Sequence, residues 1–141
     1  MILYLGTSSL VKLYIQETFS DVVRRWVEEA EIVATCRVTY TEIVSALDSR
    51  FKSNEIRKSD YELLVKALSR DWEHFAVVDF DELEAGRLVK KYGLRRFDAI
   101  HLSAAKLIVR EHREASLAFS SADARLCAAA AAEGLRVLEF R

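Results

Sequence analysis

Short apolar runs alternate with amphipathic segments along the whole chain, and this alternation most constrains the fold. Five runs are predicted to be strands, at residues 2–5, 32–35, 76–80, 116–119 and 136–140. Between them, apolar residues recur at helical spacing, and Gly93 and Gly134 follow two of the helical segments. Short apolar strands joined by helices give a parallel sheet that is covered on both faces. The sequence therefore predicts an α/β fold with three α/β/α layers around a central parallel sheet of about five strands.

No linker, repeat or low-complexity stretch divides the 141 residues, and the chain contains no proline. We therefore expect a single domain over residues 1–141. The opening apolar run is too short for a signal peptide or a membrane span. Cys36 and Cys127 are far apart and form no CxxC motif, which favours reduced thiols over a disulfide framework or a zinc site. These features predict a cytoplasmic protein that does not associate with a membrane.

Several common chemistries lack their sequence motif in this chain. The four glycines form neither GxGxxG nor a P-loop, which excludes the usual nucleotide phosphate cradles. No serine lies in a GxSxG motif, and the three histidines are not spaced as metal ligands. A net charge of −1 provides no global basic field, so any contact with nucleic acid would depend on a local patch.

Three acidic residues stand where α/β sheets place their functional crevice, beyond the carboxyl ends of the strands. Asp98 lies in the first turn of a helix whose expected apolar face includes Phe97 and Ile100. Glu42 opens the helix after the second predicted strand, and Asp123 follows the fourth. Converging carboxylates repel one another and normally persist with a bound cation. Oxygen ligands select Mg²⁺ or Mn²⁺, which activate water for displacement at phosphorus in nucleases.

Each of these acidic residues also has a purely structural explanation. Asp98 would compensate the dipole of its own helix. Glu42 would complete a capping box with Thr39, three residues earlier. Asp123 would cap the last helix of the chain. The residues by themselves leave both explanations open at all three positions.

Four segments together resemble the PIN domain family and, within it, the toxin ribonucleases of VapBC toxin–antitoxin pairs. These segments are LGTSSLVKLY at residues 5–14, TEIVSAL at 41–47, FDAIHLSAA at 97–105 and SADARL at 121–126. The resemblance covers essentially the whole chain. It implies a Mg²⁺- or Mn²⁺-dependent endoribonuclease that cleaves RNA, forms a homodimer and is inhibited by a cognate antitoxin.

The resemblance also implies which residues form the catalytic and metal-binding site. The family's acidic site maps onto three carboxylates and two polar neighbours: Glu42, Asp98 and Asp123, with Thr7 and Ser121. The chain departs from the family at Gly6, where the first strand normally ends in a metal-binding aspartate. Loss of even an outer partner typically lowers metal affinity or activity about 10- to 100-fold, so we expect weak or absent activity.

A local basic patch flanks the approach to Asp98 and is the candidate surface for binding RNA. It comprises Arg87 and Lys90 together with the three residues we consider most relevant, Lys91, Arg95 and Arg96. Cations at the end of a helix also compensate the helix dipole, so both roles stay open.

Two functions of different classes therefore compete. The first is the metal-dependent toxin ribonuclease, impaired by Gly6. The second is a catalytically silent PIN module that still binds antitoxin or RNA, and Gly6 favours it. A metal-dependent phosphatase or a flap nuclease fits less well, because the short chain leaves no room for an added arch or cap.

Overall fold

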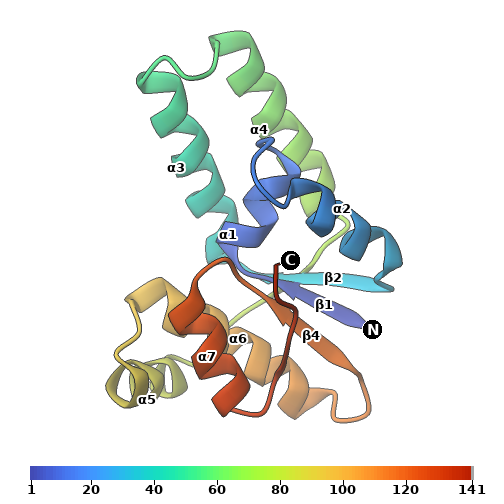
Figure 1. Cartoon of the computed structure of the whole chain (residues 1–141), viewed down its shortest axis with the longest axis vertical. Helices are drawn as coiled ribbons and strands as arrows, with labels where there is room; N and C mark the ends of the chain where they lie inside the picture. The colour runs from blue at the N-terminus through green and yellow to red at the C-terminus, as the bar shows by residue number, and fades with distance from the viewer. Residues whose placement is uncertain (141) are drawn as a thin grey trace.

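In the computed structural model, which describes residues 1–140, five parallel strands form one sheet in the order β3-β2-β1-β4-β5 (Figure 1). The strands are β1 (Ile2–Leu5), β2 (Ile32–Cys36), β3 (Ala76–Val78), β4 (Leu117–Ser120) and β5 (Arg136–Val137). The helices are α1 (Thr7–Leu10), the 3-10 helix η1 (Val11–Leu13), α2 (Ser20–Glu29), α3 (Val38–Lys52), α4 (Lys58–Trp72), α5 (Glu82–Tyr92), α6 (Arg96–Glu111) and α7 (Ala124–Ala132). The predicted α/β fold with a five-stranded parallel sheet is confirmed.

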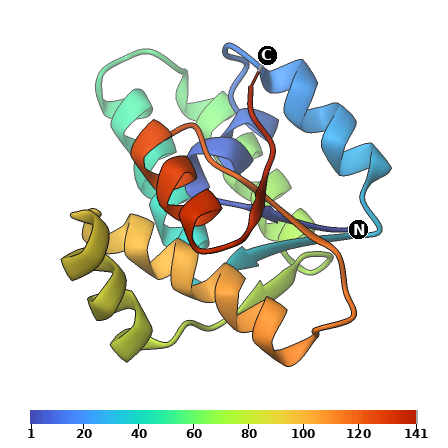
Figure 2. The ribbon, with the colours of Figure 1, turned by 60° about the horizontal axis from the view of Figure 1, so that its bottom comes forward.

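The sheet separates two helical layers and two apolar cores. Helices α1 to α4 lie on one face, and Figure 2 shows α5, α6 and α7 together on the other. Strand β1 shows how the sequence produces this arrangement. Leu3 and Leu5 pack with the first layer, whereas Tyr4 between them packs with the second. Successive side chains of a strand point to opposite faces, so a continuously apolar strand is buried only if both faces are covered.

The two edge strands are shorter than the sequence predicts. Strand β3 ends at Val78 rather than at residue 80, and β5 comprises only Arg136–Val137 of the expected 136–140. Each edge strand is hydrogen-bonded to a single neighbour, β3 to β2 and β5 to β4. An apolar run at a sheet edge continues as a strand only as far as that one neighbour pairs with it.

Helix α6 buries most of the apolar face that its spacing predicts, including Ala104 and Ile108, but it leaves Phe97 out and adds two polar residues. Phe97 is 43% exposed, whereas His101 and Ser103 are buried. Both buried polar residues find partners: His101 contacts the hydroxyl of Tyr4, and the hydroxyl of Ser103 donates to the carbonyl of Asp81 at 2.8 Å. Because these hydrogen bonds offset the loss of water, a mixed polar and apolar face can be buried here.

A nearly buried carboxylate ties the layer of α5, α6 and α7 together. The side chain of Glu133, just after α7, is 6% exposed and accepts hydrogen bonds from Arg87 at 2.6 Å, Lys91 at 3.1 Å, Lys106 at 2.5 Å and Tyr92. Burial alone would raise the pKa of Glu133, but these four donors outweigh it and hold the pKa well below its ordinary value. This network fixes the two helices that bring candidate acidic residues to the site.

We predict that Glu133→Gln lowers the free energy of unfolding near pH 7 by about 1–3 kcal/mol, because it removes the charge that four donors share. Since folding lowers the pKa of Glu133, its contribution is fully present above the ordinary glutamate pKa of about 4.3 and is lost as the pH falls toward the folded-state pKa. Urea denaturation near pH 7 and near pH 3 measures both effects.

The matched control is Glu62→Gln. Glu62 is 67% exposed and lies 3.9 Å from Lys58, so its variant should change the free energy of unfolding by less than about 0.5 kcal/mol. If Glu133→Gln lowers the free energy of unfolding equally at both pH values, the stabilisation by Glu133 does not depend on its charge.

Candidate functional site

The candidate acidic residues gather at the carboxyl ends of the strands. A cavity of about 330 Å³ opens there beside Gly6, which follows β1. Its lining includes Glu42 from α3, Asp98 from α6 and Asp123 from the loop before α7. The two predicted polar neighbours, Thr7 and Ser121, and the predicted RNA-binding residue Arg95 line the same cavity. The structure thus brings residues from four distant parts of the chain to one place.

Glu42 is held by two polar partners. Its Oε1 accepts a hydrogen bond from the Thr7 hydroxyl at 2.6 Å and lies 3.0 Å from Nε2 of His101. Burial alone would raise the pKa of Glu42, but these two hydrogen bonds lower it below its ordinary value. The capping explanation for Glu42 is wrong, because the hydroxyl of Thr39 contacts Thr35 at 2.8 Å and no side chain caps α3.

His101 is a residue of the site that sequence reasoning missed. Its side chain is 2% exposed, with Nδ1 lying 2.8 Å from the Tyr4 hydroxyl and Nε2 3.0 Å from the Thr7 hydroxyl. The ring therefore links the middle of β1 to the carboxylate of Glu42. The signal in the sequence was its position three residues after Asp98, which places both side chains on neighbouring positions of one helix face.

Asp98 faces the other two carboxylates without a hydrogen bond of its own within residues 1–140. Burial raises the pKa of the Asp98 carboxyl, and the negative charges of Asp123 and Glu42 raise it further. His101 and Arg95 oppose this effect without cancelling it. The three carboxylates therefore lie close enough to repel one another.

Asp123 caps α7, so its structural explanation is confirmed. Its Oδ1 accepts a hydrogen bond from the backbone N–H of Leu126 at 2.9 Å. The backbone N–H of Asp123 donates to the hydroxyl of Ser121 at 3.1 Å, and that hydroxyl lies 3.2 Å from the hydroxyl of Ser8. These contacts fix the loop after β4 against the start of α1. A capping role does not exclude a second role, since Asp123 also lines the acidic cavity.

Gly6 leaves the end of β1 without a side chain, although its backbone does not need glycine. Its φ of −68° and ψ of 166° are accessible to any L-residue. A Cβ atom there would lie 3.5 Å from the carbonyl oxygen of Ser120 and 3.8 Å from Cβ of Ser121, which are ordinary contacts. An aspartate side chain can therefore start from this position without backbone strain.

The side chains of the acidic cavity have the right chemistry to bind a hard cation, but too few of them converge on one point. Carboxylate and hydroxyl oxygens are the ligands that Mg²⁺ and Mn²⁺ prefer. Within residues 1–140, however, no three His, Cys, Asp or Glu side chains converge closely enough to hold one metal ion. Glu42 is turned toward Thr7 and His101, and Gly6 provides no ligand. Within residues 1–140 the side chains present therefore do not form a complete metal site.

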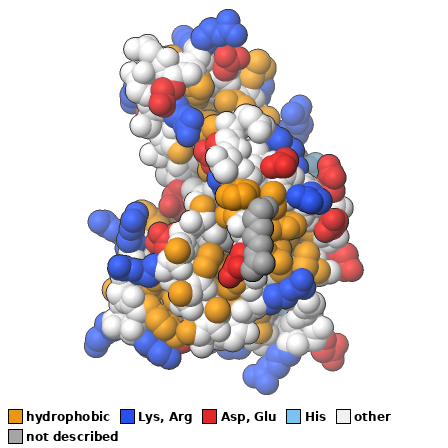
Figure 3. All heavy atoms as spheres, viewed as in Figure 1, with side chains coloured by type: hydrophobic (Ala, Val, Ile, Leu, Met, Phe, Trp, Pro, Cys, Tyr) orange, Lys and Arg blue, Asp and Glu red, His pale blue; other side chains and the backbone are white. Residues whose placement is uncertain are grey.

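The predicted RNA-binding cations do not all face the site. Arg95 lines the acidic cavity, whereas Nζ of Lys91 lies 3.1 Å from Glu133 and belongs to the ion-pair network of α5 to α7. Within the part of the chain that the structure describes, Arg95 and Arg96 form no ion pair. Figure 3 shows Lys and Arg side chains along one flank of the molecule, beside the segment where α5 leads into α6.

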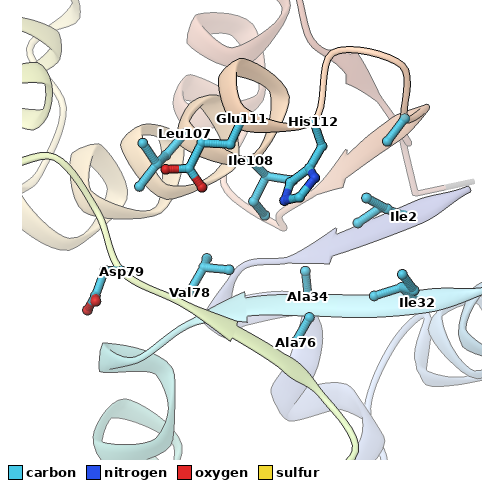
Figure 4. Close-up of a pocket in the computed structure, with 11 residues that line it drawn as sticks. Ile2, Ile32, Ala34, Ala76, Val78, Asp79, Leu107, Ile108, Glu111 and His112 are labelled. Atoms are coloured by element: carbon cyan, nitrogen blue, oxygen red, sulfur yellow. The ribbon is translucent and has the colours of Figure 1, made fainter.

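A second cavity, of about 520 Å³, lies toward the amino ends of the strands (Figure 4). Its lining comes mainly from β1 to β3 and the last turn of α6: Ile2, Ile32, Ala34, Ala76, Val78, Leu107, Ile108, Glu111 and His112. None of the candidate acidic residues borders it. Asp79 at its edge is 3.5 Å from Arg37. The smaller acidic cavity is therefore the candidate functional site.

Comparisons with known proteins identify a family and several relatives of this chain. A family model described as PIN domain matches residues 3–132. Ribonuclease VapC45 of Mycobacterium tuberculosis (strain CDC 1551 / Oshkosh) and Ribonuclease VapC49 of Mycobacterium tuberculosis (strain ATCC 25618 / H37Rv) are each 27% identical over 143 aligned positions. Each alignment covers 96% of this chain and 94% of the relative.

Three solved structures share the fold at lower identity. PAE2754 from Pyrobaculum aerophilum has a TM-score of 0.66 at 20% identity, covering 97% of this chain and 89% of its own. FitAcB from Neisseria gonorrhoeae has a TM-score of 0.65 at 16% identity, and the alignment covers 99% of this chain and 97% of the FitAcB chain. A structure of FitAB bound to an IR36 DNA fragment aligns with a TM-score of 0.61 at 17% identity, and the alignment covers 98% of this chain and 94% of the matched chain.

We predict that Asp98→Asn raises the free energy of unfolding of the metal-free protein near pH 7. Folding raises the pKa of Asp98, so the ionised carboxylate destabilises the folded state above that pKa. The penalty disappears as the pH falls below the ordinary aspartate pKa of about 3.9, and the gain from Asn should disappear with it. Chemical denaturation in the presence of a chelator, across this pH range, measures the difference.

The matched control is Asp21→Asn, because Asp21 is exposed and also stands in the first turn of a helix, α2. This control should lose about 0.3–1 kcal/mol through the helix dipole. If Asp98→Asn lost stability in the same way, Asp98 would serve its helix dipole and the proposed repulsion would be wrong.

Proposed function

The chain belongs to the PIN domain family, and on that basis we propose that it is a divalent-metal-dependent endoribonuclease, the toxin of a toxin–antitoxin pair. The observation that carries the proposal is the cavity lined by Glu42, Asp98 and Asp123 at the carboxyl ends of the strands. Two relatives that align over 96% of the chain are named ribonucleases, which supports RNA as the substrate.

In this proposal Asp98, Asp123 and Glu42 hold Mg²⁺ or Mn²⁺ at the acidic cavity. A cation held there would supply the Lewis acidity that activates water and offsets negative charge on an RNA phosphate. The family resemblance implies products that carry a 5′-phosphate. Burial and, after it, the charges of Asp123 and Glu42 raise the pKa of Asp98, and the shared cavity supports the assignment because a bound cation would offset both effects.

The other residues of the cavity orient the carboxylates and the substrate. Thr7 and His101 fix Glu42 in its ionised form, and Tyr4 fixes the ring of His101. Ser121 fixes the loop that carries Asp123. Arg95, which lines the same cavity, attracts the RNA phosphate. Arg96, the next residue, is a second candidate for this role, whereas Lys91 could take part only from its ion pair with Glu133.

We propose that Gly6 impairs this activity. The acidic site of the family normally includes an aspartate at this position, and glycine removes one ligand and one negative charge. A water can fill the vacant coordination position on Mg²⁺, but it does not replace the charge.

A catalytically silent module is the second candidate function, and a specific observation favours it. Within residues 1–140 no three acidic or histidine side chains converge on a metal position. A chain of this kind would bind RNA or antitoxin through the same fold without cleaving RNA.

We further propose that a cognate antitoxin is the protein partner, since the curated relatives carry VapC names and the family resemblance implies such a pair. The resemblance also supports a homodimer of single-domain chains, each spanning residues 1–141, in the cytoplasm. No helix within residues 1–140 combines the length and the apolar character needed to cross a membrane.

We predict that Gly6→Asp cleaves single-stranded RNA at least about 10- to 100-fold faster than the unchanged chain, because it restores a metal ligand. The backbone at this position accepts the new side chain, so the variant should fold normally. Cleavage of labelled RNA with Mg²⁺ or Mn²⁺ measures the rate, and calorimetric titration with Mn²⁺ in the absence of RNA should show tighter binding.

The matched control is Gly86→Asp, which adds the same charge on the exposed side of α5 with nothing within 4 Å of the new Cβ. It should leave metal binding and cleavage unchanged, and Gly6→Asp combined with Asp98→Asn should be inactive.

If the unchanged chain cleaves RNA as fast as Gly6→Asp, the missing carboxylate does not limit the rate of cleavage. If neither chain cleaves RNA although both bind Mn²⁺, the silent module becomes the better description.

A further inference from the structure

An exposed aromatic side chain stands directly beside the acidic site. Phe97 is 43% exposed, although it lies in the first turn of α6 immediately before Asp98. It lines a cavity of about 510 Å³ together with Val38, Thr41 and Ser45 of α3. Ligand sites in proteins typically enclose roughly 300–1,000 Å³. We call this cavity the Phe97 pocket.

The wall of the Phe97 pocket opposite the ring is one stripe of α3. Val38, Thr41 and Ser45 recur every three or four residues, so they lie on the same side of this helix. Val38 supplies an apolar surface, and the other two residues supply hydroxyl groups. Within residues 1–140 neither hydroxyl has a hydrogen-bond partner. The pocket thus offers an aromatic face and two groups that can each donate or accept a hydrogen bond.

The Phe97 pocket and the acidic cavity are neighbours, because Glu42 lines both of them. Phe97 and Asp98 are consecutive residues on α6. Phe97 lines the Phe97 pocket, and Asp98 lines the acidic cavity. Arg95 lines the acidic cavity, and Arg96 precedes Phe97; neither forms an ion pair within residues 1–140. A ligand that fills both cavities would therefore place a flat group on Phe97 and a negative group near the arginines.

Single-stranded RNA has this combination of groups. Bases stack on aromatic side chains whatever their identity, and their edges form hydrogen bonds with hydroxyl groups. Each base is joined to phosphates that unpaired arginines attract. In duplex RNA the bases stay stacked inside the helix, so only an unpaired base can enter such a pocket.

We propose that the Phe97 pocket binds one unpaired base of the RNA substrate, next to the phosphate held at the acidic cavity. The base stacks on the Phe97 ring, and Thr41 and Ser45 contact its edge. This proposal rests on the proposed function, since it assigns a subsite for the same RNA. It makes Phe97 a residue for binding and selecting the substrate, not a catalytic residue.

The first test is photo-crosslinking of the unchanged chain to a short single-stranded RNA that contains 5-iodouridine, followed by mass spectrometry of the peptides. Stacking on the ring predicts that the crosslink maps to Phe97. A protein that binds the RNA but crosslinks only at α5 or elsewhere would overturn the proposal.

The second test compares RNA affinities by fluorescence anisotropy. Phe97→Ala should bind single-stranded RNA about 10-fold more weakly, and Phe97→Tyr should keep the original affinity because it retains the ring. Leu83→Ala is the matched control, since Leu83 is another apolar residue, 84% exposed on α5 and absent from both cavities. It should leave the affinity unchanged.

An RNA with an abasic nucleotide at the crosslinked position separates base stacking from other effects. Phe97→Ala should weaken binding of the normal RNA but not of the abasic RNA. An equal loss for both RNAs would mean that the variant disturbs the protein rather than the stacking, and would overturn the proposal.

The same variants in the Gly6→Asp background distinguish the two proposals. If Gly6→Asp cleaves RNA with or without the Phe97 ring at equal KM, the nuclease stands and the Phe97 pocket is wrong as a base subsite. If no variant binds or cleaves RNA, both proposals fail, and a protein partner becomes the better occupant for the exposed ring.

Discussion

The parallel pairing of β1 with both β2 and β4 is the constraint on which the rest of the structure depends. Because all five strands run in one direction, their carboxyl ends meet at one edge of the sheet. The segments that follow these ends deliver Thr7, Glu42 and Asp123 to a single cavity, and the start of α6 adds Asp98. Residues far apart in the chain meet here because each lies just beyond a strand or at the start of a helix.

The electrostatics of this cavity distinguish two of its carboxylates, Glu42 and Asp98. Glu42 is stabilised as an anion by the Thr7 hydroxyl and by His101, whose ring is fixed by Tyr4 inside the sheet. Asp98 has no such partner within residues 1–140 and is destabilised by the neighbouring charges. The site therefore has one carboxylate fixed by the protein and one that would gain most from a cation. Gly6 adds no charge to this cavity, so it adds no further repulsion among the carboxylates.

The two faces of the sheet contribute differently to the site. The layer of α5, α6 and α7 is fixed by Glu133 and its four donors, and it carries Asp98 and Phe97. The opposite layer carries Glu42 and the α3 stripe that faces the Phe97 ring. The acidic cavity and the Phe97 pocket both lie between these layers, so RNA bound there would contact both. With a net charge of −1 on the chain, the proposed RNA contact would depend on local cations such as Arg95 at the acidic cavity.

The sequence by itself determined the class of fold, because a continuously apolar strand such as Ile2–Leu5 can only be buried with helices on both sides. It also indicated the end of α5 at Gly93 and the capping role of Asp123, since both residues act through the backbone of their immediate neighbours. These features depend on local geometry, which the order of residues specifies directly.

Only the tertiary structure decided the partners of Glu42 and the face of α6 that is buried. Glu42 has Thr39 as a plausible capping partner three residues away, but its real partners, Thr7 and His101, are 35 and 59 residues away. Apolar spacing alone would bury Phe97 and says nothing of His101, yet Phe97 is exposed and His101 is buried with a hydrogen-bond partner, Tyr4, on the sheet. A hydrogen bond between distant segments can reverse a local preference, because its partner exists only after the chain has folded.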